Sequence, residues 1–355
     1  MSIDPSLSKA MLGRIRLGGK RELLAQTLYW SGASHLISRF PSRDSLMVLN
    51  YHRIGNSSDD LFDPGVFSAT ADQLDDQIGY LKKRLAIVSL EEALAFVEGH
   101  DREKAPRCRV LITFDDGYLD NYQVAFPILR SHGVQGVFFL ATGLVGSCHV
   151  PWWDRIAFLV RTARSRQFSL HYPGSLLVDL DNDGVESSLR AILKLYKRPD
   201  NSDPQRFIKE LETQSRGEDP PADMRRFLNW DEAIEMQGAG MAIGSHTHSH
   251  HVLSQLAPQQ QKEELCKSRS ILVEKLGAQI DVLAYPVGAR TSFDDCTRNA
   301  AKEAGYRAAF SFYGGINLPG KTTPYDVNRV AVEDQSRRRF RVRMAATRSL
   351  GTCWP

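Results

Sequence analysis

The feature of this chain that most constrains its fold is the alternation of short apolar runs with segments of helical periodicity. Apolar runs read as strands lie at residues 45–52, 85–90, 109–114, 134–142, 241–245, 279–286 and 306–312. Helical patterns lie among them at 71–84, 91–99, 119–133, 228–240, 258–277 and 293–305. Strands that are apolar along most of their length and alternate with helices are typical of a parallel sheet covered by helices. The pattern predicts an α/β fold, a distorted (β/α) barrel with about seven parallel strands.

An open, doubly wound sheet is the alternative arrangement of the same elements. A sheet of that type that binds a dinucleotide carries a GxGxxG fingerprint directly after a strand. None of the expected strands is followed by one, which weakens this interpretation.

Breaks in the alternation indicate how the chain is organised. We expect a helical, basic N-terminal segment at 1–44, a barrel at 45–335 and a basic C-terminal tail at 336–355. Residues 143–227 lose the rhythm and hold a charged stretch, so they are read as an insertion in the barrel rather than an independent domain. In the C-terminal tail, an exposed helix or strand face is favoured over an anion-binding site.

The composition argues against several classes of protein. A net charge of +3 over 355 residues is too small to indicate a nucleic-acid-binding protein. The five cysteines are odd in number and irregularly spaced, without a CxxC pair, so no disulfide framework or zinc knuckle is expected. No secretory signal and no run of about 18–20 apolar residues is visible, which predicts a cytoplasmic protein. The segment at 1–44 is read as a solvated helix that caps the fold, with contact to the inner face of an anionic membrane as the alternative.

Two adjacent carboxylates, Asp115 and Asp116, close the apolar run of LITFDDG at 111–117. Like charges this close repel each other, and near a core they need a cation or hydrogen-bond donors as compensation. A surface turn is the alternative, because Asp-Gly pairs are common turn formers.

A second polar cluster, GSHTHSHH at 244–251, follows another expected strand. His246 and His250 are four residues apart, so on a helical turn they would share one face and suit one divalent metal ion. A polar loop or a weakly binding histidine tract is the alternative. The carboxyl ends of parallel strands meet at one rim of a barrel, so the cluster is expected beside the two aspartates. Two histidines and one carboxylate would leave positions open for water and substrate, while the other carboxylate serves as a base.

At these motifs the chain resembles a known family. TFDDG at 113–117, HTHSH at 246–250 and AYPVG at 284–288, in this order, are similar to the motifs of the polysaccharide deacetylase (NodB-homology, carbohydrate esterase 4) family. The resemblance covers roughly residues 45–332 and is weakest over 143–227. It implies a distorted (β/α) barrel, in agreement with the strand pattern.

The resemblance also implies roles for individual residues. Asp115 corresponds to the catalytic base, and Thr247 fills the small hydroxyl position of the histidine motif. His248 and His251 match no ligand position. The implied ligands of one divalent metal ion, expected to be zinc, are Asp116, His246 and His250.

The implied reaction is hydrolysis of an N-acyl group, usually the acetamide of an N-acetylated sugar. A metal ion lowers the pKa of bound water from ~15.7 to about 7. Asp115 takes the proton of that water, and a backbone N–H near Val287 helps to stabilise the oxyanion. An acid must then protonate the departing amine.

The sequence departs from the family at two points. Ala284 stands where many members carry an arginine that orients the base, so what orients Asp115 is left open. The Leu-x-His motif that often supplies the acid is missing, because 328–335 contains no histidine. We expect His52, at the end of the first strand, to act in its place; a hydrogen-bonding role in the turn is the alternative.

Aromatic residues are candidates for the wall of a sugar site. In PWWDR at 151–155, an indole face suits the apolar face of a pyranose, Asp154 could orient polar groups, and buried packing of the tryptophans is the alternative. Tyr118 is expected to pack on the following helix. The residues predicted to bind substrate are Trp153, Tyr285, Val287 and Thr247.

The sequence therefore predicts a metal-dependent hydrolase that removes N-acetyl groups from a sugar of a polysaccharide, oligosaccharide or lipid-linked glycan precursor. A role in exopolysaccharide biosynthesis fits this substrate class. A deacylase or deformylase of small amides is one alternative, and a metal-bearing sugar-binding module with weak or no turnover is another.

Overall fold

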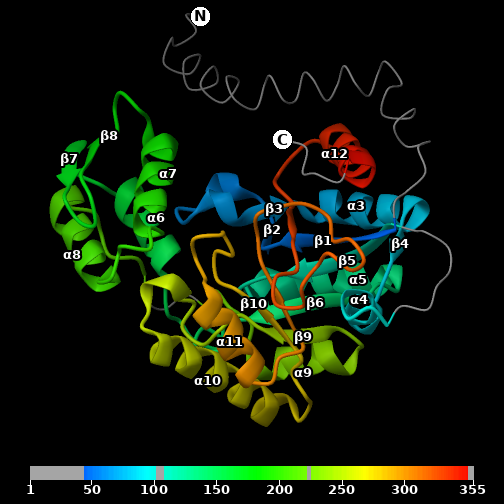
Figure 1. The fold of residues 1–355 in the computed structure, drawn as a ribbon. Coiled ribbons are helices and arrows are strands. Elements are labelled where there is room, and N and C mark those ends of the chain that lie inside the picture. Colours follow the sequence, from blue (N-terminus) through cyan, green and yellow to red (C-terminus); the bar gives the residue numbers. More distant parts are fainter. Residues whose placement is uncertain (1–43, 101–107, 222–224, 351–355) are drawn as a thin grey trace, which may run out of the picture.

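The computed structural model describes residues 44–100, 108–221 and 225–350, and a parallel sheet lies at its centre (Figure 1). In the main order β11-β10-β9-β6-β5-β1-β12, every neighbouring pair of strands is parallel. The strands are β1 Ser45–Tyr51, β5 Cys108–Phe114, β6 Gly136–Leu140, β9 Ala242–Ser245, β10 Val282–Ala284, β11 Ala308–Phe310 and β12 Val330–Ala331. The sheet curls into a half-barrel, and a parallel bridge joins Phe310 to Val327. The predicted distorted (β/α) barrel with about seven parallel strands is confirmed.

The membership of the sheet differs from the prediction at two places. The run at 85–90 contributes only β4, Ala86–Ile87, which pairs with β5 beside the main order. The strand is short because Ser89 and Glu92 form a capping box that starts helix α4. The seventh strand of the main order is instead β12, a two-residue strand whose polar neighbours conceal it in the sequence.

Helices surround this sheet (Figure 1). Their bounds are α3 Ala71–Arg84, α4 Leu90–Val97, α5 Phe126–His132, α9 Trp230–Gly238, α10 Pro258–Leu276 and α11 Asp295–Glu303. The helix predicted at 119–133 differs most, because a π-helical turn, Asn121–Ala125, precedes α5. Pro127 has no N–H to donate to the carbonyl of Gln123, which disfavours regular α-helix at this point.

Alternate residues of each strand face opposite sides of the sheet, and each side has its own core. Leu46 and Val48 of β1 pack inside the half-barrel in one cluster with Phe139 and with residues of α4. Met47 and Leu49 point the other way, into the larger core that includes residues of the surrounding helices. The two faces therefore fill with side chains, and polar groups are left to the ends of the strands.

Residues 143–227 build a region with its own hydrophobic cluster, drawn in green at the left of Figure 1. Its helices and strands are α6 Trp152–Arg161, β7 Gln167–Leu170, β8 Leu176–Asp179, α7 Val185–Tyr196 and α8 Pro204–Ser215. The strands β7 and β8 form an antiparallel hairpin separate from the main sheet. Ile156, Leu189 and Phe207 bring the three helices together in this cluster. The region is called the inserted region below.

The C-terminal basic segment forms helix α12, Arg337–Leu350, which contacts α3. Phe340 is buried and meets Tyr80 edge-on at 6.3 Å between ring centroids, and Arg341 pairs with Asp76. From Phe340 to Thr347 all side chains except Arg341 are buried, and Arg337 is the one exposed residue among those whose burial is described, so the predicted exposed face is wrong. Apart from Asp44, the expected N-terminal segment at 1–44 lies outside the described residues. Within the described ranges, no helix combines the length and the apolar character that a membrane span requires.

Candidate metal centre and active site

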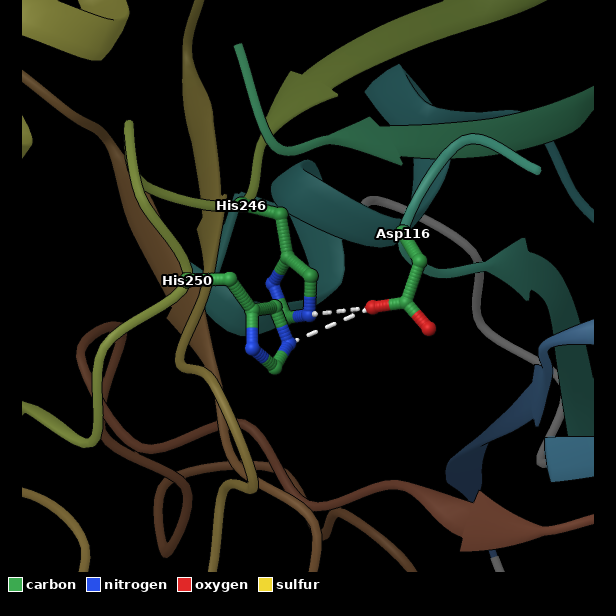
Figure 2. A group of neighbouring side chains, drawn as sticks. All are labelled: Asp116, His246 and His250. Carbon is green, nitrogen blue, oxygen red and sulfur yellow. Dashed lines mark ion pairs between the residues drawn. The ribbon is translucent and has the colours of Figure 1, made fainter. Parts of the chain in front are cut away.

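The carboxyl ends of β5 and β9 bring one carboxylate and two imidazoles together (Figure 2). Asp116 Oδ1 lies 3.4 Å from Nε2 of His246 and 3.2 Å from Nε2 of His250. All three side chains are buried, and their ligand atoms lie within 4.8 Å of one another. Two imidazole nitrogens and a carboxylate oxygen form a donor set that suits a zinc-like divalent cation.

Neighbouring groups and burial favour the forms of Asp116, His246 and His250 that can bind a metal ion. His246 Nδ1 lies 2.7 Å from the carbonyl oxygen of Ala284, which can only accept, so Nδ1 is a donor and Nε2 is the ring nitrogen that faces Asp116. Burial would raise the pKa of Asp116, but hydrogen bonds from His246 and His250 hold it well below its usual range. Burial also lowers the pKa of His250, which favours the neutral, ligating imidazole. The residues present therefore fit a divalent cation.

The backbone of the centre is strained. Among the described residues, five non-glycine positions have positive φ, and four of them belong to the motifs of this site: Asp116, Thr247, His250 and Val287. The helical turn expected for the two histidines is wrong, because Thr247 at φ 64° and His250 at φ 56° make a left-handed loop instead. Such conformations cost of order 1–3 kcal/mol each and concentrate where a site demands them.

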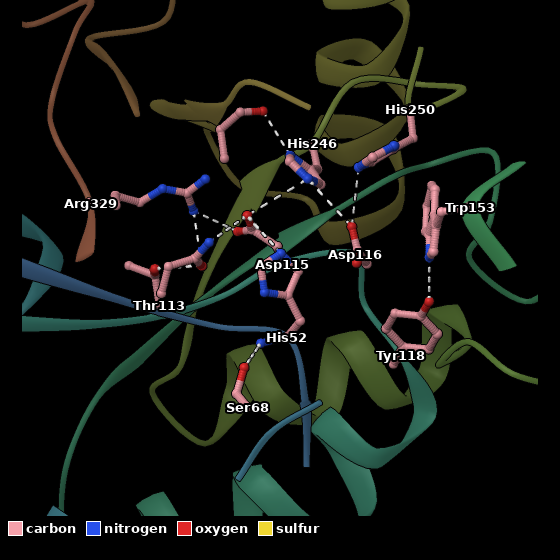
Figure 3. A network of polar contacts seen from close by, with 12 residues as sticks. His52, Ser68, Thr113, Asp115, Asp116, Tyr118, Trp153, His246, His250 and Arg329 are labelled. Carbon is pink, nitrogen blue, oxygen red and sulfur yellow. Dashed lines mark hydrogen bonds and ion pairs between the residues drawn. The ribbon is translucent and has the colours of Figure 1, made fainter. Parts of the chain in front are cut away.

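Arg329 orients Asp115. The sequence alone did not identify the residue with this role. Arg329 Nη1 donates to Asp115 Oδ1 at 2.6 Å and to Asn50 Oδ1 at 3.1 Å, and Asn50 Nδ2 donates to Asp115 Oδ2 at 3.0 Å (Figure 3). Burial would raise the pKa of Asp115, but the charges of Arg329, His246 and His52 together outweigh it and lower the pKa. Ala284, at the expected arginine position, packs inside the half-barrel. In the sequence, Arg329 stands in NRV at 328–330, and no local pattern there marks it as a partner of Asp115.

His52 lies at the rim of the site, next to Asp115. Its Nε2 is 4.0 Å from Asp115 Oδ2, and its side chain is 22% exposed. The backbone N–H of His52 donates to Ser68 Oγ at 2.9 Å, and the ring meets Phe312 edge-on. The His52 ring is thus held near Asp115 and also lines the cavity.

These groups line a cavity of about 680 Å³ between the sheet and the inserted region. Trp152, Trp153 and Val287 also line it, as predicted for Trp153 and Val287. The Trp153 ring lies 4.3 Å from that of His250, and Trp152 Nε1 donates to the carbonyl oxygen of His250 at 3.1 Å. The tryptophans therefore pack against a candidate ligand and also form part of the wall.

A buried network holds Trp153 from behind (Figure 3). Trp153 Nε1 donates to Tyr118 Oη at 2.7 Å, and that hydroxyl donates to Asp154 Oδ2 at 2.9 Å. Arg226 also donates to Asp154 Oδ2, at 2.8 Å. Tyr118 packs in the core of the inserted region, where it stacks on Phe227, and not, as was predicted, in the cluster that contains the following helix. It does not line the cavity, and Asp154 accepts from its hydroxyl.

The structure does not bring two of the predicted substrate contacts to the cavity. Tyr285 is fully buried on the outer face of the sheet, where it stacks on Phe293 at 4.2 Å and donates to the carbonyl oxygen of Tyr325. Strand alternation explains this placement, because Ala284 takes the inner face. Thr247 is also buried, and its Oγ1 accepts from the backbone N–H of His250 at 3.2 Å, so it shapes the loop.

Comparison with known proteins identifies the class that this fold and site define. The family model described as "Polysaccharide deacetylase" matches residues 102–309, so the chain belongs to the polysaccharide deacetylase family.

Two curated relatives match in sequence. The chain is 24% identical over 262 residues to "Putative polysaccharide deacetylase YxkH" of Bacillus subtilis (strain 168), covering 74% of this chain and 62% of that protein. It is 32% identical over 116 residues to "Poly-beta-1,6-N-acetyl-D-glucosamine N-deacetylase" of Staphylococcus epidermidis, covering 30% of this chain and 39% of that protein. The matches thus span less than two thirds of either relative.

The fold is shared with solved structures. The Streptococcus pyogenes deacetylase PplD in complex with acetate aligns with a TM-score of 0.55 and 18% identity, over 86% of this chain and 98% of that one. IcaB from Ammonifex degensii aligns with a TM-score of 0.55 and 22% identity, over 87% of this chain and 98% of that one.

Proposed function

We propose that this chain is a metal-dependent amide hydrolase that removes the acetyl group from an N-acetylated sugar of a polysaccharide, oligosaccharide or lipid-linked glycan precursor. The observation that carries the proposal is the cluster of Asp116, His246 and His250 beside an aspartate that Arg329 keeps ionised. One relative is named for acting on an N-acetylated glycan, which supports the substrate class. A place in exopolysaccharide biosynthesis follows from the same substrate.

The cluster would hold one divalent cation, for which we propose zinc because nitrogen donors outnumber the oxygen donor. When bound, such an ion acidifies water and polarises the acetamide carbonyl. Side chains and backbone groups of this chain are proposed to carry out the proton transfers and to stabilise the oxyanion.

Asp115 is proposed as the base that takes a proton from the attacking water. Arg329 and Asn50 fix its carboxylate in one orientation, and its lowered pKa leaves it ionised at neutral pH. As the C–O bond forms, the backbone N–H of Val287 is proposed to donate to the developing oxyanion. The C–N bond then breaks, the departing amine takes a proton from His52, and acetate leaves with the new oxygen.

Acetate release from a panel of N-acetylated oligosaccharides by the zinc-reconstituted protein tests this function. Formylated and acetylated small amides in the same panel separate a glycan deacetylase from a small-amide deacylase. In Asp115→Asn, we expect turnover to fall by about 10³-fold or more while one metal ion per chain is retained. In Asp116→Asn, both turnover and metal content should be lost.

Two results would contradict the proposal. Equal loss of metal in the Asp115 and Asp116 variants would show that the roles are not divided as proposed. Metal binding without release of acetate from any glycan would instead favour a sugar-binding module.

For location we propose the cytoplasm; the basic and apolar residues of the segment at 1–44 would allow contact with the inner face of an anionic membrane as the alternative. Cell fractionation with an antibody tests this, and recovery of an N-terminally processed form outside the cytoplasm would refute it.

A further inference from the structure

Four cationic side chains line the cavity on the wall that the inserted region provides: Arg190, Lys194, Lys197 and Arg198. Arg190 and Lys194 lie on α7, and the other two directly follow it. Their spacing of four, three and one residues places them along one side of the helix and its end. The opposite side of α7 is apolar and packs into the core of the inserted region, through Leu189 and Ile192.

Most of this positive charge is not neutralised by neighbouring carboxylates. Arg198 pairs with Asp200, with Nε 2.8 Å from Oδ1. Among the described residues, Arg190 and Lys194 form no ion pair and no hydrogen bond, and both are exposed. These two guanidinium and ammonium groups are therefore available to a ligand that enters the cavity.

Lys197 is less exposed than Arg190 and Lys194, and it lines the same cavity. Its Nζ is 5.7 Å from the centre of the Trp152 ring, which also lines the cavity. Burial lowers its pKa, and the attraction of Asp63 and Asp116 offsets this only in part. Besides Asp115 and Asp116, Asp63 is the one carboxylate among the described lining residues; it accepts from the backbone N–H of Gly65, and burial raises its pKa. An incoming anion would stabilise the charged form of Lys197.

Cationic helix surfaces are usually solvated and bind nothing specific, but two features separate this one from that case. The side chains line the same cavity as Asp115 and Asp116, and an aromatic ring, Trp152, lies between them and the metal centre. An aromatic ring suits a sugar, and arginine and lysine suit phosphate or carboxylate oxygens. Along the cavity, the candidate metal centre is thus followed by the Trp152 ring and then by the cationic side chains.

We propose that the substrate is an anionic glycan, in which a phosphate or carboxylate group next to the N-acetylated sugar binds Arg190, Lys194 and Lys197. This inference rests on the proposed function and narrows its substrate class. The cavity volume of about 680 Å³ is in the range of sites that enclose a ligand larger than one sugar ring.

The test measures kcat/KM for deacetylation of three probes by the zinc-loaded protein. N-acetylchitotetraose is neutral, UDP-N-acetylglucosamine carries phosphates, and a hyaluronan tetrasaccharide carries carboxylates. We expect an anionic probe to be preferred over the neutral one, and the preference to fall by about tenfold in the double variant Arg190→Gln/Lys194→Gln. The probe that loses more identifies phosphate or carboxylate as the group recognised.

The matched control is Lys209→Gln/Lys302→Gln, which removes two exposed cations, of α8 and α11, that do not line the cavity. It should leave the preference for an anionic probe unchanged. A non-specific effect of net charge would instead lower this preference equally in both variants. Equal kcat/KM for neutral and anionic probes, or equal effects of the two double variants, would overturn the inference.

A binding measurement keeps this result distinct from failure of the proposed function. Titration calorimetry of the anionic probes into zinc-loaded Asp115→Asn protein needs no turnover. A Kd that rises about tenfold when Arg190 and Lys194 are also replaced supports the anion site even if no probe is deacetylated. An unchanged Kd overturns it, whether or not acetate is released.

Discussion

The carboxyl end of the sheet and the inserted region share one cavity, but they are built in opposite ways. At the sheet end, Asp115 and Arg329 are almost fully buried, and each makes hydrogen bonds that fix its orientation. On the inserted region, Arg190 and Lys194 are exposed side chains on a helix whose other side packs in a separate core. The proposed reacting groups thus have fixed positions, whereas the proposed site for a charged group relies on long, exposed side chains.

Replacement of His52 by Gln is the strongest test of the claim that the sheet end supplies every reacting group. General acids contribute about 10²–10⁴-fold to such reactions, so we expect kcat to fall by about 10³-fold. Metal content and KM should change little, because His52 is not in the ligand cluster. Steady-state kinetics and metal analysis measure these quantities.

His248→Gln is the matched control, because this histidine belongs to the same motif as the ligands but pairs with Thr142. It should keep kcat within about twofold of the original, because His248 is not in the candidate ligand cluster and does not line the cavity. Comparable losses in the two variants would show that His52 is no acid.

Replacement of Arg329 by Gln sharpens the comparison by testing how far activity depends on a fixed base. We expect kcat to fall by about 10²-fold, because Asp115 loses its orientation and its compensating charge. The pKa of Asp115 is lowered by Arg329, so removal of the guanidinium raises that pKa. The acidic limb of the pH–rate profile should therefore move to higher pH.

Arg329→Lys keeps the charge but not the paired donors, so its acidic limb should stay closer to that of the original protein. A fall in activity without any shift of the pH profile in Arg329→Gln would reduce the role of Arg329 to packing.

Replacement of Asp154 by Asn concerns the inserted region, where we expect an effect on stability and little on turnover. Burial raises the pKa of Asp154 from 3.8 to about 6, so the folded protein binds this proton more tightly than the unfolded chain. Its contribution to stability is present below about pH 4 and is lost as the pH rises through about 6. The cost of the substitution should therefore be about 2 kcal/mol larger at pH 4.5 than at pH 7.

Urea unfolding of the metal-free proteins at the two pH values measures this difference. An unchanged cost would mean that Arg226 already keeps Asp154 ionised at pH 4.5. A fall in kcat per folded molecule at pH 7 would contradict the claim that Asp154 affects stability and not turnover.

What could be predicted from the sequence was local in the chain. Alternating strands and helices fixed the barrel, and DDG and HTHSH each sit directly after a strand, so their meeting follows from parallel topology. Arg329 escaped because its partner Asn50 is 279 residues away, and no local pattern reports such a contact. Tyr285 escaped because a shift of one residue along a strand exchanges the cavity side for the helix side. Arg190 and Lys194 of α7 were not predicted as site residues, because the sequence of a basic helix in an insertion does not differ from that of a solvated surface helix.

The left-handed loop residues have a consequence for how the protein matures. Thr247 and His250 adopt conformations that an isolated segment seldom visits, so the ion-binding geometry exists only once the surrounding sheet has assembled. A ligand that binds only the folded form adds its binding energy to the stability of that form. Under the proposed function, loading with metal would be coupled to the last stage of folding, and a chelator should lower the stability of the protein to that of its metal-free form.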